Sequence, residues 1–111
     1  MAGPVELGDD DYETLLPASP GVTLVEVWAP NCGPCTAQKR STQAFAAEYG
    51  ERIQVARING AAATGFCRRY GVRAVPTLLV FRAGQMTARL LGNHSVAELK
   101  QALITPLPAA G

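Results

Sequence analysis

The chain has 111 residues, 48% of them hydrophobic, and its ten basic and nine acidic side chains leave a formal net charge of +1. This length suits one domain with one core, and we expect a single domain over residues 1–111 with its ordered part at about 9–105. The near balance of charge argues against a nucleic-acid-binding protein, and no apolar segment approaches the length that spans a bilayer.

The amino terminus and the cysteine count indicate a cellular compartment. The first residues contain neither a basic segment nor an apolar one, so they do not form a secretory signal. Three cysteines are an odd number and too few for a disulfide-stapled secreted scaffold. We therefore expect a reducing cytoplasm. The basic cluster of Arg68, Arg69 and Arg73 is interpreted as a solvated face.

The first predicted elements are a helix and a buried strand. Three aspartates precede the pattern Tyr12 to Leu16, which is typical of a short helix with acids at its positive end, and Pro17 terminates it. The apolar run Val22 to Ala29 is rich in β-forming residues and predicts an interior strand. Turn residues follow from Pro30 to Pro34.

A longer helix and a second strand come next. No Gly or Pro interrupts the sequence from Cys35 to Tyr49, and Gly50 caps the predicted helix. Apolar residues from Ile53 to Ile58 predict the strand. The residues expected to share one face of the helix are Ala37, Ala44, Phe45 and Tyr49.

The remaining predicted elements complete an α/β fold. They are a helix over Thr64 to Tyr70 closed by Gly71, a strand from Thr77 to Phe81, a hairpin at Ala83-Gly84 with a return strand through Met86, Ala88 and Leu90, and a helix opened by the capping box Ser95 to Glu98. Pro106 and Pro108 end the structure and leave a short tail. A parallel crossover followed by an antiparallel hairpin predicts a three-layer sandwich, with a mixed central sheet between helices.

The stretch "VEVWAPNCGPC" (25–35) places two thiols at the end of the buried strand. Cys32 lies where the next helix begins, and unpaired backbone N–H groups and the helix dipole favour its thiolate there. Cys35 lies one turn further on, deeper, and within disulfide range of Cys32. We therefore expect Cys32 to be the nucleophile of dithiol–disulfide exchange and Cys35 the resolving thiol.

Glu26 lies in the middle of the same strand. An unpaired carboxylate in a core strand is costly, so the group is expected to hold a proton near neutral pH and to act as an acid/base for Cys35. The alternative is that Glu26 is paired with Arg57 or Lys39 and is structural.

A pair of cysteines two residues apart is also compatible with half of a zinc site, which Cys67 and His94 would complete. The strand-to-helix junction argues against this interpretation, because structural zinc usually rests on loops. We expect neither a metal nor a cofactor. Cys67 is interpreted as a buried small apolar residue, with a regulatory or dimer-forming thiol as the alternative, and His94 as a surface residue.

The sequence resembles the thioredoxin family from about Asp9 to Ile104. A CGPC motif after a "WA" strand end, with "VPT" about forty residues later, is highly specific. The resemblance implies the thioredoxin-like three-layer sandwich. The matching residues are Trp28-Ala29, Cys32-Gly33-Pro34-Cys35, Tyr70-Gly71-Val72-Arg73, Val75-Pro76-Thr77, Phe81, Gly84 and Gly92.

The resemblance also implies roles for residues outside the thiol pair. Pro76 would be cis and packed beside the cysteines, and the backbone of Val75 would pair with an extended substrate segment. The residues implied to bind substrate are Trp28, Asn31, Gly33, Pro34, Ala74, Val75, Gly92 and Asn93. The implied activity is reduction of protein disulfides by a protein that a flavin- and NADPH-dependent thioredoxin reductase recharges. We expect a monomer that binds neither nucleic acid nor membrane.

A few positions depart from the family pattern. Asn31 stands where the family usually has Trp, and Glu26 where it usually has Asp. Arg40 replaces the proline that kinks the active-site helix, so this helix is expected to be straighter. Ser41 and Thr42 stand at usually aliphatic positions, so the helix is expected to pack less apolar area. These departures indicate a specialised member.

The leading hypothesis is an enzyme that reduces protein disulfides and serves electron transport and cell redox homeostasis. One alternative is a thioredoxin-fold binding or assembly module with incidental thiols, and another is a disulfide oxidase or isomerase. The CGPC motif and Pro76 favour the enzyme over the module, because a scaffold needs neither. Pro34 resembles the reducing branch of the family more than the oxidising one.

Overall fold

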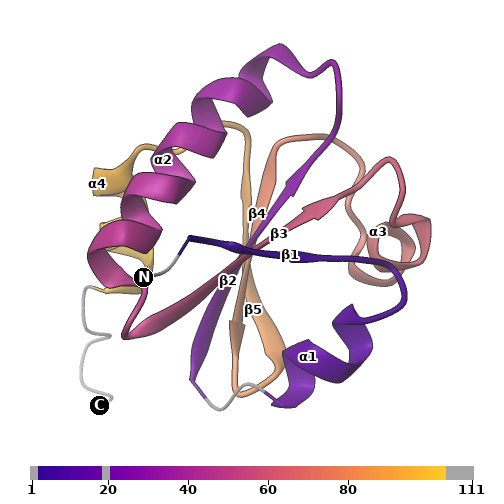
Figure 1. Ribbon diagram of the computed structural model, residues 1–111, viewed down its shortest axis with the longest axis horizontal. Coiled ribbons are helices and arrows are strands. Elements are labelled where there is room, and N and C mark those ends of the chain that lie inside the picture. The colour runs from indigo at the N-terminus through magenta and orange to yellow at the C-terminus, as the bar shows by residue number, and fades with distance from the viewer. Residues whose placement is uncertain (1–2, 19–20, 105–111) are drawn as a thin grey trace.

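Nine elements follow one another in the computed structural model, which describes residues 3–18 and 21–104 (Figure 1). The sequence predicted eight of them and missed the first strand, whose three residues are too few to show an alternating pattern. The tail expected around Pro106 and Pro108 lies outside the described residues. The elements are β1 (Val5–Leu7), α1 (Tyr12–Ala18), β2 (Val22–Trp28), α2 (Gly33–Tyr49), β3 (Ile53–Asn59), α3 (Thr64–Tyr70), β4 (Thr77–Arg82), β5 (Gln85–Leu91) and α4 (Val96–Leu103).

The strands form one mixed sheet in the order β1-β3-β2-β4-β5. The first three are parallel to one another, β4 pairs antiparallel with β2, and β5 pairs antiparallel with β4. Figure 1 shows α2 and α4 on one side of the sheet and α1 and α3 on the other. The predicted three-layer α/β sandwich is therefore confirmed.

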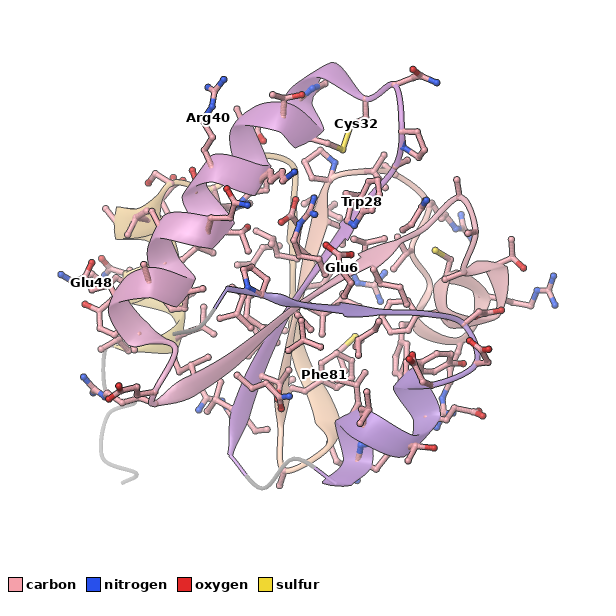
Figure 2. The ribbon with its side chains drawn as sticks, viewed as in Figure 1. Glu6, Trp28, Cys32, Arg40, Glu48 and Phe81 are labelled. Atoms are coloured by element: carbon pink, nitrogen blue, oxygen red, sulfur yellow. A yellow bond between two sulfur atoms is a disulfide. The ribbon has the colours of Figure 1, made fainter. Side chains whose placement is uncertain are left out.

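Strand alternation divides the core into two halves. Leu24 of β2 packs with the residues beneath α2 and α4, whereas its neighbours Val25 and Val27 pack with those beneath α1 and α3. Phe81 belongs to the second group and lies on the far side of the sheet from α2 (Figure 2). Because Glu26 alternates with Val25 and Val27, its side chain points to the α2 side.

The local corrections concern helix ends and one helix face. Pro17 lies inside α1, which runs on to Ala18, and Gly50 caps α2 in the right-handed region (φ −62°). Ala37 and Ala44 are exposed whereas Phe45 and Tyr49 are buried, so the prediction that these four residues share one face of α2 was wrong. Its buried residues are Cys35, Gln38, Thr42, Phe45, Ala46 and Tyr49.

Glycine and capping signals mark the elements around the site. Gly71 ends α3 with φ +70°, and its backbone N–H donates a hydrogen bond to the carbonyl oxygen of Cys67. Ser95 and Glu98 form the predicted capping box of α4.

Within the described part of the chain, no helix combines the length and the apolar character that a membrane crossing requires.

Candidate active site

Helix α2 begins at the two thiols. Cys32 is its N-cap residue, with an extended backbone, and its sulfur accepts a hydrogen bond from the backbone N–H of Cys35 at 3.2 Å. The structure contains the Cys32–Cys35 disulfide, whose Cα atoms are 5.3 Å apart. After reduction, the same N–H and the positive end of the helix face the Cys32 sulfur and favour its thiolate. Pro34 lies in the first turn, where a missing N–H breaks no intrahelical bond.

The two sulfurs differ in their access to solvent. Cys35 is 5% exposed, whereas Cys32 is only half-buried. Figure 2 shows Cys32 where α2 begins, with Trp28 below it in the same view. The Cys32 sulfur is therefore the more accessible of the two to another molecule.

The loop before β4 faces the disulfide. The Val75–Pro76 peptide bond is cis, as the resemblance implied, and the Val75 carbonyl oxygen lies 4.0 Å from the Cys32 sulfur. In the disulfide that sulfur carries no hydrogen, so this is a contact and not a hydrogen bond. The Thr77 hydroxyl donates to the Ala74 carbonyl at 2.6 Å and ties the loop to the start of β4.

Asn31 has a left-handed backbone, with φ +60°. Among residues with a side chain, asparagine tolerates this conformation best, and its position turns the chain from β2 into α2. The residue is exposed, so it leaves the entrance to Cys32 without the apolar cover of a larger side chain.

Five of the eight residues predicted to bind substrate line two hollows. Trp28, Asn31 and Gly33 line the first, of about 360 Å³, together with both cysteines, Ala29, Thr36, Lys39 and Arg57. Ala74 and Val75 line the second, of about 260 Å³, together with Gly60, Ala61, Cys67, Val72 and Arg73. Pro34, Gly92 and Asn93 line neither of these hollows. Gly92 nevertheless joins the site, because its N–H donates to the Pro76 carbonyl at 3.0 Å.

A row of three charged residues crosses the sheet on the α2 side. Glu6, Arg57 and Glu26 are register partners on the adjacent strands β1, β3 and β2. Arg57 donates from Nε to Glu26 and from a terminal nitrogen to Glu6, each at 2.9 Å. Its guanidinium also lies 4.9 Å from the centre of the Trp28 ring. Arg57 thus connects β1 with the hollow that contains the cysteines.

The structure decides how Glu26 is accommodated. The carboxylate is fully buried and paired with Arg57, so the assumption of an unpaired acid was wrong and the alternative partner Arg57 is the one present. Its second oxygen, Oε2, has no hydrogen-bond partner among the described residues. Glu6 could not be found from the sequence, because β1 was not predicted. The role of Glu26 in proton transfer stays a prediction.

Cys67 and His94 each have a side-chain contact with a backbone carbonyl, and neither belongs to the thiol pair. Cys67 is half-buried, its thiol donates to the Gly60 carbonyl at 3.6 Å, and burial, followed by the charge of Asp9, raises its pKa. His94 is half-buried, with Nδ1 3.0 Å from the Gly92 carbonyl. Within residues 3–18 and 21–104, no three His, Cys, Asp or Glu side chains come together to hold a metal ion. The zinc set that the sequence left open therefore does not assemble there.

A mixed sheet between two helical layers, with a disulfide at a helix N-terminus opposite a cis-proline, defines a thioredoxin-fold dithiol–disulfide site. Comparison with known proteins agrees, because the model of the thioredoxin family matches residues 3–105. The chain belongs to the thioredoxin family.

Named relatives cover most of the chain. It is 36% identical over 95 residues to a thioredoxin of Allochromatium vinosum, covering 86% of this chain and 89% of that protein. It is 37% identical over 93 residues to a thioredoxin of Acidithiobacillus ferridurans, covering 84% and 86%. A chloroplastic M-type thioredoxin of Chlamydomonas reinhardtii is 28% identical over 95 residues, covering 86% and 68%.

Family and site together establish the activity. The protein is a thiol–disulfide oxidoreductase that uses the Cys32–Cys35 pair. In general, members of this family act on protein disulfides and exchange electrons with thioredoxin reductases.

Proposed function

We propose that this protein works as a reductant of protein disulfides, with Cys32 as nucleophile and Cys35 as resolving thiol. The observation that carries the proposal is the position of the Cys32 sulfur at the start of α2, accepting the Cys35 N–H, with Cys35 buried behind it. A thiolate stabilised there is both a nucleophile and a good leaving group, as both halves of the exchange require.

The reaction has two displacement steps. The Cys32 thiolate attacks one sulfur of a substrate disulfide; the substrate S–S bond breaks, and the released thiolate takes up a proton. The Cys35 thiolate then attacks the Cys32 sulfur, the mixed disulfide breaks, and the second substrate thiol leaves. Two electrons have moved to the substrate, and the protein holds the Cys32–Cys35 disulfide that the structure contains.

Other residues support these steps. Glu26 would accept the proton of Cys35, directly or through a water molecule, and Arg57 would hold its carboxylate in place. Val75, in the loop with Pro76, would pair with an extended substrate segment beside Cys32. Among the implied groove residues, Trp28, Asn31 and Gly33 would form the wall nearest to the cysteines.

The cellular setting follows from the direction of the reaction. The protein would receive electrons from a thioredoxin reductase that uses a flavin and NADPH. It would work in the cytoplasm, as a single domain and a monomer, in electron transport and redox homeostasis. The CGPC motif, which resembles that of reducing members, supports this setting over an oxidase or isomerase.

Serine variants test the thiol assignment. Cys32→Ser should abolish insulin reduction with dithiothreitol, because no thiolate remains to attack. Cys35→Ser should accumulate mixed disulfides with substrate, because nothing displaces the bound thiol. Insulin reduction by Cys32→Ser would overturn the nucleophile assignment, and the absence of trapped adducts in Cys35→Ser would overturn that of the resolving thiol.

A reduction potential tests the direction. Equilibration with glutathione buffers should give a value close to the −270 mV typical of a reducing thioredoxin, about 150 mV below that of a strong disulfide oxidant. A value near that of the oxidant would favour the reverse reaction. A folded protein that reduces no disulfide, although its thiols are free, would favour the binding module.

A further inference from the structure

The buried face of α2 contains a polar pair that the chemistry described above does not use. Gln38 is 1% exposed and Thr42 is fully buried, one and two turns after Cys35. Both ends of the Gln38 amide are occupied: Nε2 donates to the Thr42 hydroxyl at 3.2 Å, and Oε1 accepts the backbone N–H of His94 at 2.6 Å. A buried amide is costly unless it is hydrogen-bonded, so this geometry is strongly specified.

The partner of Gln38 lies beside the active site. His94 belongs to the short segment between β5 and α4, which also contains Gly92 and Asn93. From the other side, the Gly92 N–H donates to the carbonyl of Pro76 at 3.0 Å. The segment Gly92–His94 is thus tied at one end to the cis-proline loop and at the other to the helix that carries both thiols.

We propose that Gln38 is a positioning residue for protein substrates, which holds the Gly92–His94 segment in the arrangement that receives an extended chain beside Cys32. This inference rests on the proposed function, since that segment is one wall of the expected groove. An aliphatic side chain of similar size would fill the same space but would accept no hydrogen bond. The backbone at His94 would then lose its restraint to α2. The restraint on the segment is therefore specific to the amide.

The proposal separates two kinds of substrate. The hydrogen bonds of Gln38 go to Thr42 and His94, and within residues 3–18 and 21–104 none joins it to either sulfur or to Glu26. A small disulfide needs only the exposed Cys32 sulfur, whereas a protein disulfide also needs the wall of the groove. A loss confined to protein substrates is the signature of positioning, because a general loss of stability or of thiol reactivity affects both substrates alike.

The test compares Gln38→Met with Thr42→Val. Gln38→Met keeps the length of the side chain and removes both hydrogen bonds, whereas Thr42→Val disturbs the same buried site and leaves the bond to His94 in place. For each variant, KM and kcat are measured with insulin, and the single-turnover rate of the pre-reduced protein is measured with 5,5′-dithiobis(2-nitrobenzoate).

We expect Gln38→Met to raise KM for insulin about three- to tenfold, as the loss of one hydrogen bond implies, with a smaller change in kcat and in the small-disulfide rate. Thr42→Val should raise KM by less. Unchanged KM in a folded Gln38→Met protein, or equal losses with both substrates, would overturn the inference. If Gln38→Met does not fold, Gln38→Asn carries the same test, because its shorter side chain keeps the amide but does not reach His94. A wild-type protein inactive with both substrates would instead refute the proposed function.

Discussion

At the scale of single residues, the site depends on how its charges are distributed. The Cys32 sulfur has a backbone N–H within 3.2 Å, and the buried Glu26 shares Arg57 with the half-exposed Glu6. Removing one partner of a buried ion pair is far more costly than removing an exposed one. Arg57 therefore compensates the buried Glu26 carboxylate in the core, and Glu6 completes the pairing of the Arg57 guanidinium from the edge of the sheet.

Glu26→Gln tests proton transfer to and from Cys35. The amide oxygen still accepts the Arg57 N–H but takes up no proton, so the resolving step should slow by about tenfold or more at neutral pH. The measurement is the decay of a pre-formed mixed disulfide between pH 5 and 9. An unchanged profile would make Glu26 a structural partner of Arg57 only.

Cys67 should be an unreactive thiol. In the oxidised protein it is the one free cysteine of the three, so alkylation reports on it alone. Because burial and the Asp9 charge raise its pKa, less thiolate is present at a given pH, and iodoacetamide should label it more slowly at pH 8 than in the urea-unfolded oxidised chain. The difference should shrink as the pH rises. Equal rates at pH 8 would contradict this expectation.

At the scale of elements, the quality of the sequence predictions followed the clarity of local signals. Helix α3 was predicted with the bounds that it has, because Gly71 ends it in a conformation that glycine adopts without strain. The face of α2 was predicted less well, because two of its buried positions are polar and two nearby alanines are exposed. Hydrophobicity alone cannot identify a buried glutamine that is satisfied by a backbone N–H from a distant segment.

The cap of α3 gives a prediction about stability. Gly71→Ala places a Cβ at φ +70°, where the left-handed backbone penalises it, and should lower the free energy of unfolding by about 1 kcal/mol. Gly71→Asn, which tolerates this conformation, should cost less. The measurement is urea unfolding of both variants beside the wild type. Equal stability of Gly71→Ala and the wild type would show that the cap relaxes without cost.

At the scale of the whole molecule, the layers and the thiol pair could be predicted from the sequence. The hydrogen bonds between side chains and segments of different elements could not. The three-layer sandwich followed from the order of the elements, and the Cys32–Cys35 site from a motif at a strand-to-helix junction. Glu6 required the short strand β1, and the bond from Gln38 to His94 joins residues 56 positions apart. Such contacts depend on how the layers pack, and a short local pattern does not reveal them.

The most direct test of the central claim is the pH dependence of Cys32 alkylation. In reduced protein carrying Cys67→Ser, the iodoacetamide labelling of Cys32 is followed by peptide mass spectrometry between pH 5 and 10. We expect the rate to reach half its maximum about one pH unit or more below the value for the same chain unfolded in urea, because the start of α2 stabilises the thiolate. Coincident curves for the folded and unfolded chains would contradict Cys32 as the activated nucleophile.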